Sequence, residues 1–392
     1  MNEINLPEHW RIFRFTDCLK KVKAKKKSSI PKRDYQESGE FPVIDQGASF
    51  IAGWTDLAES IISDNLPVVI FGDHTRVFKY VDFPFALGAD GTQLLYPNDE
   101  ILDPHFFYYF LLNVKVPNKG YNRHYRYLRE FSVVCPPLPE QRAIAHVLQT
   151  IQEAKSTRQR EIALERERKA ALMDDLFSHG TKGEPRKQTE IGEIPESWEV
   201  VELKKTADLR RENVKPEDNQ NLNFVGLEHI DSGESTLKRC GDASPMKSAK
   251  NRFYPDDILY GKLRSYLDKA VIAEMDGICS TDILVFTANS EIVPRFLVYL
   301  LHTEVFVNHA VATSTGISHP RTSWDSLEKF TFALPPLSEQ HAIAAVFQAI
   351  DKKTAALERE VEHLDELFHA MLDELMTGQR SAVPLIDTEM DV

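Results

Sequence analysis

A long run near the C-terminal end places apolar residues at alternating steps of three and four. It contains no Gly or Pro over about 40 residues, which in a helix would span about 60 Å. Such steps put the apolar side chains on one narrow face and predict a coiled-coil seam. The predicted seam comprises Phe347, Ile350, Leu357, Val361, Leu364, Phe368, Met371 and Leu375, with polar Thr354 among them.

A similar run after residue 138 predicts a second helix of the same length. Its seam is apolar at Leu148, Ile151, Ile162, Leu172 and Leu176, and charged at Lys155, Arg158, Glu165 and Lys169. We expect each helix to be the partner of the other. The alternative is two unrelated amphipathic helices, each packed on its own domain.

The two helices belong to a duplicated block. "PPLPEQRAIAHVLQTI" from Pro136 returns 199 positions later as "PPLSEQHAIAAVFQAI" from Pro335, and the copy continues without a gap to Phe177. An earlier marker also recurs, because "LPEHW" at Leu6 resembles "IPESW" at Ile194. Between these markers the two stretches show little likeness. Since solenoid units recur every ~20 to 50 residues, the pattern predicts two copies of a domain with a shared frame and different content.

Both variable stretches read as mixed α/β. "LPVVIFG" at Leu66 and "DILVFTA" at Asp282 predict buried strands, while "PHFFYYFLLN" at Pro104 and "PRFLVYLLH" at Pro294 predict short apolar helices. We therefore expect an α+β fold with two mixed α/β domains separated by two long antiparallel helices that form a coiled coil. A pseudo-twofold, near-circular layout follows if "TGQRSAVPLID" from Thr377 returns toward the first domain.

The expected boundaries follow from these markers. We assign 1–135 to the first variable domain, 136–180 to the first helix, 181–194 to a linker, 195–334 to the second variable domain, 335–380 to the second helix and 381–392 to a tail.

In each half, a loop rich in basic, aromatic and hydroxyl residues follows the short apolar helix. These loops are "KGYNRHYRYLR" at Lys119 and "TSTGISHPRTSW" at Thr313, and basic turns follow the strands at "GDHTR" and "GKLRSY". Cations contact phosphate, while Arg, Asn, His and Ser/Thr can address base edges in the major groove. Either loop alone could be a solvated connector, but recurrence at the same place favours DNA binding.

The candidate DNA-binding residues come from these loops and from the lysine run at Lys20, which could contact phosphate or simply be solvated. They are Lys20, Lys21, Lys25, Lys26, His74, Thr75, Arg76, Tyr121, Asn122, Arg123, His124, Tyr125, Arg126, Lys262, Arg264, Tyr266, Ser314, Thr315, Ser318, His319, Arg321 and Thr322.

Composition is ordinary for a soluble globular chain of 392 residues. The net charge of −13 argues at first against a nucleic-acid partner, but from Asp351 onward 11 acidic residues face 4 basic ones. Because fields act over a Debye length of ~8 to 10 Å, a basic face remains possible. No signal peptide or span of ~20 apolar residues is evident, and four scattered cysteines predict reduced thiols in the cytoplasm.

Catalytic motifs are missing from the sequence. No phosphate-binding Gly-rich loop, no amino-methyltransferase motif and no metal-spaced histidine pair occurs. "PDDILYGK" at Pro255 resembles the start of a nuclease motif but lacks its acidic-x-Lys completion, so a strand-entry turn is the better interpretation. We expect no catalytic residues, no metal site and no cofactor on this chain.

The repeated Pro-Glu-x-Trp marker, the repeated "PPLxEQxAIA" phrase and the paired helices together resemble the specificity subunit of Type I restriction-modification systems. The resemblance implies two target recognition domains, each reading one half of a bipartite double-stranded DNA sequence. It implies that the helices space the halves and dock two methyltransferase subunits, to which motor-nuclease restriction subunits attach. It also places S-adenosylmethionine, ATP and Mg²⁺ on those partners.

Two other classes stay open from the residues alone. One is a DNA-modifying enzyme with an unrecognised active site, and the other is an architectural coiled-coil adaptor that binds DNA without sequence preference.

Overall fold

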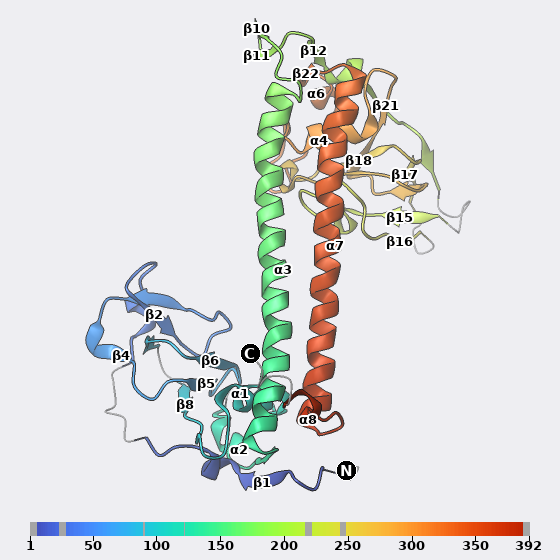
Figure 1. Cartoon of the computed structure of the whole chain (residues 1–392). Helices are drawn as coiled ribbons and strands as arrows, with labels where there is room; N and C mark the ends of the chain where they lie inside the picture. The colour runs from blue at the N-terminus through green and yellow to red at the C-terminus, as the bar shows by residue number, and fades with distance from the viewer. Residues whose placement is uncertain are drawn as a thin grey trace. The chain divides into compact units, whose positions relative to one another are not determined.

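The computed structural model describes residues 6–22, 29–88, 91–120, 122–215, 222–243 and 248–386. Two compact units emerge: residues 1–159 with 359–392 form unit 1, and residues 160–358 form unit 2. Each unit contains one variable domain and half of each long helix (Figure 1). Neither helix therefore belongs to one domain alone.

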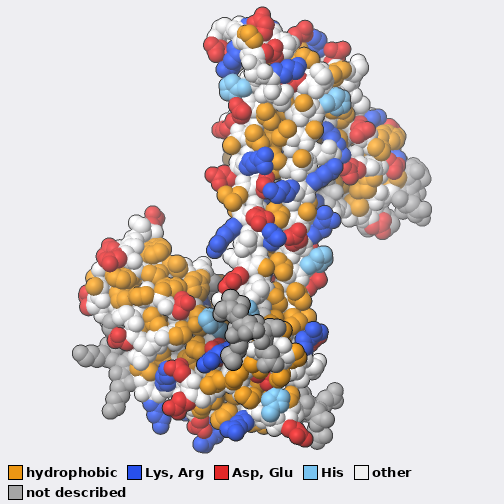
Figure 2. All heavy atoms as spheres, viewed as in Figure 1, with side chains coloured by type: hydrophobic (Ala, Val, Ile, Leu, Met, Phe, Trp, Pro, Cys, Tyr) orange, Lys and Arg blue, Asp and Glu red, His pale blue; other side chains and the backbone are white. Residues whose placement is uncertain are grey.

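The long helices are α3 (Leu138–His179) and α7 (Leu337–Met376), of 42 and 40 residues. The charged positions of the α3 seam each pair with α7: Lys155–Asp365 and Arg158–Glu360 in unit 1, and Glu165–Lys353 and Lys169–Asp351 in unit 2. In both units the residue number of the α7 partner falls as the residue number along α3 rises, so the helices are antiparallel. Figure 2 shows basic and acidic side chains interspersed over the helices.

Most apolar seam positions are buried. Those are Leu148, Ile151, Ile162, Leu176, Phe347, Ile350, Leu357, Phe368 and Leu375, and the half-buried ones are Leu172, Val361, Leu364 and Met371. Toward the C-terminal end of each helix the buried position shifts by one, to Met173 and Leu372. A straight helix of 3.6 residues per turn drifts in this way from a strict 3.5-residue pattern.

The variable domain of unit 1 contains two small sheets. The four-stranded sheet has the order β3-β2-β7-β4, built from β2 (Phe41–Ile44), β3 (Gly53–Thr55), β4 (Ile61–Ile62) and β7 (Phe85–Leu87). The three-stranded sheet has the order β6-β5-β8, built from β5 (Val68–Gly72), β6 (Phe78–Val81) and β8 (Thr92–Leu95). Helices α1 (Pro104–Asn113) and α2 (Tyr125–Leu128) follow.

The variable domain of unit 2 repeats this plan with more strands. Its four-stranded sheet, β13-β21-β18-β19, comprises β13 (Ala207–Leu209), β18 (Ile258–Gly261), β19 (Ala270–Ile272) and β21 (Ile283–Ala288). The five-stranded sheet, β14-β17-β20-β15-β16, comprises β14 (Asn213–Val214), β15 (Asn223–Val225), β16 (Gly241–Asp242), β17 (Lys250–Phe253) and β20 (Gly277–Cys279). Helices α4 (Pro294–Leu301), α5 (Glu304–Ala312) and α6 (Trp324–Leu327) follow.

The repeated sequence markers close each domain. In unit 1, β1 (Arg11–Arg14) follows the Trp10 marker and pairs antiparallel with β9 (Ser132–Cys135), which precedes the Pro-Pro-Leu phrase. In unit 2, β12 (Glu199–Glu202) and β22 (Thr331–Leu334) do the same. The markers therefore bring the two ends of each variable stretch together.

The Gln of the repeated "EQ" pair fastens each long helix to its domain. Gln340 is 1% exposed; its side chain accepts from Val293 N (2.8 Å) and donates to Glu291 O (3.0 Å) and Pro335 O (2.9 Å). Gln141 makes the matching bonds to Asp103 N, Ile101 O and Pro136 O. Since buried backbone groups need partners, this amide joins the start of the helix to the turn before α1 or α4.

The neighbouring Glu339 joins two further segments, the loop after α3 and the marker that contains Trp198. It is 1% exposed and accepts hydrogen bonds from Thr181 N (2.9 Å) and Trp198 Nε1 (3.2 Å), with Lys182 Nζ at 3.3 Å. Although burial alone would raise the pKa of Glu339, these partners hold that pKa below its usual value.

Glu140 occupies the matching place in unit 1. It contacts His9 Nε2 at 2.8 Å and accepts from Ser381 Oγ at 3.3 Å. Ala382 is fully buried in the core of this unit, next to α8 (Val383–Ile386). The chain thus returns to its first domain, which confirms the near-circular layout. The stretch we expected to be a plain linker differs: it forms a hairpin of β10 (Arg186–Thr189) and β11 (Gly192–Pro195).

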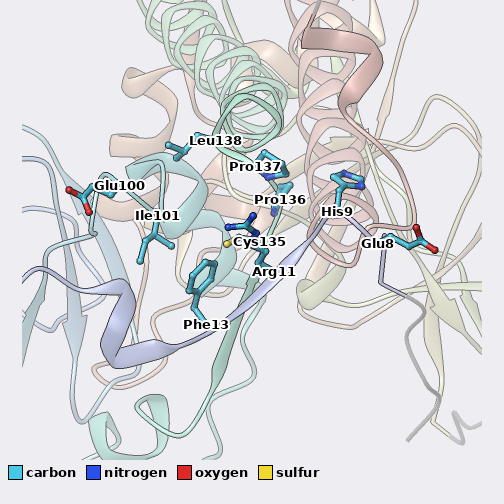
Figure 3. Close-up of a pocket in the computed structure, with 10 residues that line it drawn as sticks. All are labelled: Glu8, His9, Arg11, Phe13, Glu100, Ile101, Cys135, Pro136, Pro137 and Leu138. Atoms are coloured by element: carbon cyan, nitrogen blue, oxygen red, sulfur yellow. The ribbon is translucent and has the colours of Figure 1, made fainter.

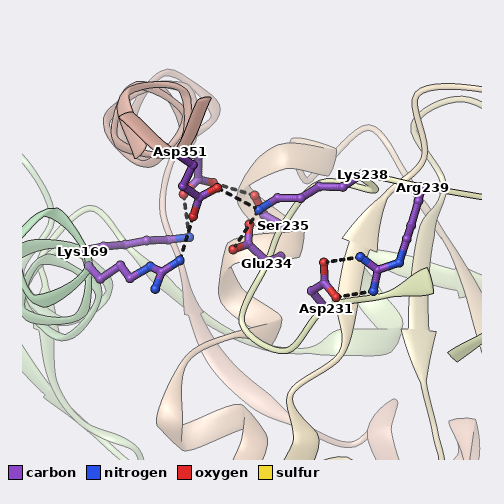
Figure 4. A network of polar contacts seen from close by, with 9 residues as sticks. Lys169, Asp231, Glu234, Ser235, Lys238, Arg239 and Asp351 are labelled. Carbon is purple, nitrogen blue, oxygen red and sulfur yellow. Dashed lines mark hydrogen bonds and ion pairs between the residues drawn. The ribbon is translucent and has the colours of Figure 1, made fainter. Parts of the chain in front are cut away.

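Each domain also packs on its half of the helix pair through a tyrosine, but with different chemistry. Tyr109 of α1 donates to Gln152 at 3.0 Å, and Tyr299 of α4 donates to Asp351 at 2.8 Å. Gln152 and Asp351 occupy the same place in the duplicated helices. Only unit 2 is ionic there, because Asp351 also pairs with Lys169 at 2.7 Å (Figure 4).

We expect Gln340→Ala to destabilise the protein by about 1 to 3 kcal/mol, since it leaves buried backbone groups without partners. The control is Gln159→Ala, an exposed glutamine of α3, which should change stability by less than about 0.5 kcal/mol. Denaturant unfolding measures both. Equal effects would contradict the role of the repeated Gln.

A second prediction concerns pH. Burial would raise the pKa of Asp351, but the Lys169 ammonium and hydroxyl donors hold it below its ordinary 3.8. A depressed folded-state pKa gives stabilisation that is complete above the unfolded value and lost as pH falls through the folded one. Asp351→Asn should therefore cost about 1.5 to 3 kcal/mol at pH 7 and less below pH 3.8.

Gln152→Ala is the matched neutral change in unit 1. Its cost should not vary over the same pH range, because no charge is removed. Urea unfolding at several pH values measures both costs. A cost of Asp351→Asn that does not change with pH would contradict a stabilising ion pair between Asp351 and Lys169.

Candidate functional site

The candidate site in each domain begins where a central strand ends in glycine. A Cβ on Gly72 would lie 2.2 Å from Thr75 Oγ1, and one on Gly261 would lie 2.9 Å from Leu227 Cδ2. Both contacts are too close for a larger residue. A larger residue at either strand end would therefore displace the Thr75 or the Leu227 side chain, so glycine lets these side chains pack against the strand end.

In unit 1 three segments meet at this point: the turn 73–77, Gly91 before β8, and the described residues of the loop after α1, 117–120 and 122–126. Asp73 N donates to Gly91 O (2.6 Å), and Asp73 O accepts from both His124 N (3.0 Å) and His124 Nδ1 (2.8 Å). The Asp73 carboxylate accepts from Tyr125 N at 2.7 Å. We call these segments the first loop cluster.

The second loop cluster comprises the matching segments of unit 2: 262–268, 280–282 and 313–322. Lys262 N donates to Asp282 O (2.9 Å), and Thr322 N donates to Lys262 O (3.1 Å). Arg264 N donates to Pro320 O at 2.8 Å. The basic turns and the hydroxyl-rich loops singled out in the sequence thus come together, separately in each unit.

An arginine in the left-handed region follows the strand end in both clusters. Arg76 has φ 64° and Arg264 has φ 55°. Side chains other than glycine pay about 1 to 3 kcal/mol for such backbone, and these costs concentrate at functional sites. The two guanidinium groups differ, because Arg76 donates to Val116 O at 3.2 Å, while Arg264 is exposed and its side chain donates to no described residue.

The candidate residues divide by exposure. Exposed ones include Thr75, Asn122, Arg123, Arg126, Arg264, Tyr266, Thr315, Ser318, His319 and Arg321. His74, Tyr125, Lys262 and Ser314 are half-buried, and His124 and Thr322 are buried. Arg126 stacks over the Tyr127 ring at 4.5 Å. His124 and Thr322 can each hold the loops of their own cluster together, whereas the exposed groups other than Arg321, which Asp282 binds, are available to a ligand.

The described part of the lysine run lies outside the first loop cluster. The Lys20 side chain forms an ion pair with Asp99, and Lys20 N donates to Tyr96 O. Both partners follow the C-terminal end of β8, whereas Gly91 precedes its N-terminal end. Lys21 is exposed. Lys25, Lys26 and Tyr121 lie outside the described residues.

Sequence reasoning missed the acids that organise the clusters. Arg321 donates two hydrogen bonds to the Asp282 carboxylate, from Nε at 2.9 Å and from Nη2 at 3.3 Å. These bonds hold the pKa of Asp282 below its usual value. Asp73 was likewise overlooked, although each acid directly follows or precedes a buried strand. Ile317, fully exposed at the tip of the second cluster, was missed because it is an isolated apolar residue.

Unit 1 also contains a cavity of about 730 Å³, located where β1 and the Pro-Pro-Leu phrase meet. Glu8, His9, Arg11 and Cys135 are among the residues around it (Figure 3). Burial raises the pKa of the Cys135 thiol to about 11, so that this thiol is not an activated nucleophile. Across the described ranges no cluster of three metal-ligating side chains occurs. Nor is any helix there both long enough and apolar enough to cross a membrane.

Two similarly framed domains, each with a polar loop cluster and joined by a helix pair, define a two-site recognition protein. Residues 7–166 and 195–365 match the family described as "Type I restriction modification DNA specificity domain". The chain belongs to this family, and the duplication seen in the sequence corresponds to two copies of its domain.

Characterised relatives match over nearly the whole chain. The Type I restriction enzyme EcoDI specificity subunit of Escherichia coli is 26% identical, over 97% of this chain and 91% of its own length. The Type I restriction enzyme MjaVIII specificity subunit of Methanocaldococcus jannaschii is 25% identical, over 97% and 95%. Both matches span both domains and both helices.

Solved structures share the fold. The S subunit of a Type I restriction-modification system from M. genitalium superposes with a TM-score of 0.60, at 14% identity, covering 95% of this chain and 96% of that one. A chain from a structure of complex assembly and conformational transition in a type I R-M system gives 0.54, at 17% identity and with 95% and 98% covered.

Asp282→Asn should loosen the second loop cluster by weakening its pair with Arg321. We expect faster amide hydrogen exchange at Thr315, Arg321 and Thr322, with no change in α7. Mass spectrometry of the exchanged peptides measures this. Unchanged exchange in 313–322 would show that the pair does not organise the loop.

Proposed function

We propose that this chain is the specificity subunit of a Type I restriction-modification complex and that each loop cluster reads one half of a bipartite DNA target. One observation carries the proposal: the same three-segment cluster is built twice on a duplicated frame, with different exposed side chains each time. A duplicated frame with divergent readers suits a split target, because each half can then be specified independently.

The exposed side chains fit direct readout. Arg123 and Arg264 can donate two hydrogen bonds to guanine O6 and N7, and Asn122 can bond the adenine edge. Thr315 and Ser318 can bond several bases, while Ile317 can contact a thymine methyl group. Stacking on Tyr127 keeps the Arg126 guanidinium in one orientation, as bidentate recognition requires.

The charge distribution is compatible with DNA. The acidic excess is concentrated from Asp351 onward, and much of it is paired with α3, whereas the loop clusters carry the exposed arginines. Fields are screened within ~8 to 10 Å, so the local sign decides the contact. The net charge of −13 also suggests that partners supply part of the positive surface around DNA.

We further propose that the chain is a non-catalytic, cytoplasmic component of this complex. Two methyltransferase subunits dock on the helix pair and the repeated frames, which also space the two half-sites, and restriction subunits join through them. S-adenosylmethionine, ATP and Mg²⁺ are then bound by those partners. The raised thiol pKa of Cys135 and the pairing of the Asp282 carboxylate with Arg321 agree with a binding role for this chain.

The experiment is to map methylated adenines in a host that carries this gene with its neighbours, using Arg123→Ala and Arg264→Ala variants. If each guanidinium reaches a base edge, specific binding should weaken by about 1 to 3 kcal/mol and one half-site should relax at one position. Arg123→Ala should affect only one half, and Arg264→Ala only the other.

Arg14→Ala is the control, since its side chain is 83% exposed on β1 and outside both clusters. It should leave the target unchanged. A uniform loss on all DNA sequences would assign the two arginines to phosphate contacts. Methylation without any bipartite preference in the unaltered protein would favour an architectural adaptor and end the proposal.

A further inference from the structure

A lysine inside the first domain fixes a loop that no sequence pattern marks. Lys79 of β6 is 4% exposed, and its ammonium donates to Asp45 O (2.8 Å), Ser49 O (2.6 Å) and Phe50 O (3.4 Å). These carbonyls belong to the loop 45–50 that follows β2. Three carbonyls of one short loop therefore converge on a single buried cation.

Burying the Lys79 ammonium costs free energy, which suggests that this residue has a specific role. Burial lowers the pKa of Lys79, and the nearby Asp45 carboxylate, 3.9 Å from its nitrogen, opposes this only in part. Charged side chains are almost never fully buried unless they are paired. An apolar residue at this strand position would pack more easily but would leave the loop carbonyls without a donor.

The other side of the same loop supports the first loop cluster. Gln46 Oε1 accepts from His74 N (3.2 Å), and Gln46 O accepts from Thr75 Oγ1 (2.6 Å). Gly72 and Gly91 leave the space that Gln46 occupies, because a Cβ on either would come within 3.0 Å of its side chain. Loop 45–50 is thus the support on which the turn 73–77 rests.

The second domain contains a smaller version of this contact at a different residue. Lys269, just before β19, is half-buried and donates to one carbonyl, Leu227 O at 2.6 Å, in the loop that follows β15. The Leu227 side chain then packs against Gly261, at the strand end where the turn to Lys262 and Arg264 begins. Strands β15 and β20 pair in parallel, as β2 and β7 do, so the supported loops correspond.

We propose that Lys79 and Lys269 are positioning residues for half-site specificity. Each fixes the loop after the domain's parallel-paired strand, and that loop fixes the strand-end turn that presents the DNA-reading side chains. Neither lysine touches DNA. This inference rests on the proposed function, and it assigns to each lysine control over one half of the target.

The test uses the full chain, co-expressed with its gene neighbours, and selection from DNA with both half-sites randomised. Lys79→Met keeps the length and removes the charge. It should lower base discrimination several-fold at one or more positions of the half-site that Arg123 affects, and leave the other half unchanged. Lys269→Met should do the reverse. Lys79→Arg, which keeps a cationic donor, should restore part of the discrimination.

Loss of stability is the competing explanation, and a matched variant separates it. Val81 lies on the same strand and is fully buried in a cluster with Val68 and Ile70, so Val81→Ala opens a cavity without removing any side-chain hydrogen bond to loop 45–50. It should lower the unfolding midpoint yet leave base preference unaltered. Gln46→Ala, a milder change at the surface of the loop, should reproduce the relaxed half-site even if Lys79→Met does not fold.

Unaltered base preference in both Lys79→Met and Gln46→Ala, while Arg123→Ala changes it, would overturn this inference and leave the proposed function standing. Relaxation by Val81→Ala, or of both half-sites by Lys79→Met, would also overturn it. No effect from any of these variants, Arg123→Ala included, together with no bipartite preference in the unaltered protein, would instead remove the proposed function.

Discussion

The rest of the structure depends on a constraint at the start of each long helix: buried polar groups must find partners. The repeated Glu-Gln pair meets it twice, since Gln340 satisfies the backbone before α4 and Glu339 accepts from the loop after α3. The two Gln340 bonds span 47 and 49 residues of the chain, and the Glu339 bond to Thr181 spans 158. Because a buried polar group left unpaired costs more than the bond itself contributes, the pair tolerates little change. This explains why the phrase recurs while the stretches between its copies diverge.

That frame leaves the variable domains free to differ. Strand pairs β1–β9 and β12–β22 close each domain at its base, so the sequence between them can vary as long as the ends meet. The contacts between each domain and the helix pair differ in the same way. Tyr109 donates to Gln152 in unit 1, and Tyr299 donates to the charged Asp351 in unit 2. One architecture thus accommodates two chemically different domains, which is what a protein with two independent readers requires.

The loop clusters show how specificity can be built above such a frame. Their centres are backbone hydrogen bonds and two acids, Asp73, which is buried, and Asp282, which is half-buried. The exposed side chains come from the turns with left-handed arginines and from the loops 122–126 and 313–322. Buried supports, such as Lys79 under loop 45–50, bear no chemistry for DNA and yet decide where the exposed groups point. A change of target can therefore arise from residues that never contact it.

The sequence by itself determined the repeat, the two helices of about 40 residues, their antiparallel pairing and the strands at "VVIFG" and "ILVFTA", because periodicity and duplication are properties of the chain. It also singled out the basic turns and the loops after the short helices, which the clusters bring together. Only the tertiary structure decided that His124 and Thr322 are buried, that Arg321 is held by Asp282, that Lys20 lies elsewhere and that 181–194 contains a hairpin. The physical reason is that exposure and pairing depend on which distant segments meet, and no local pattern records which carbonyl a buried lysine will reach.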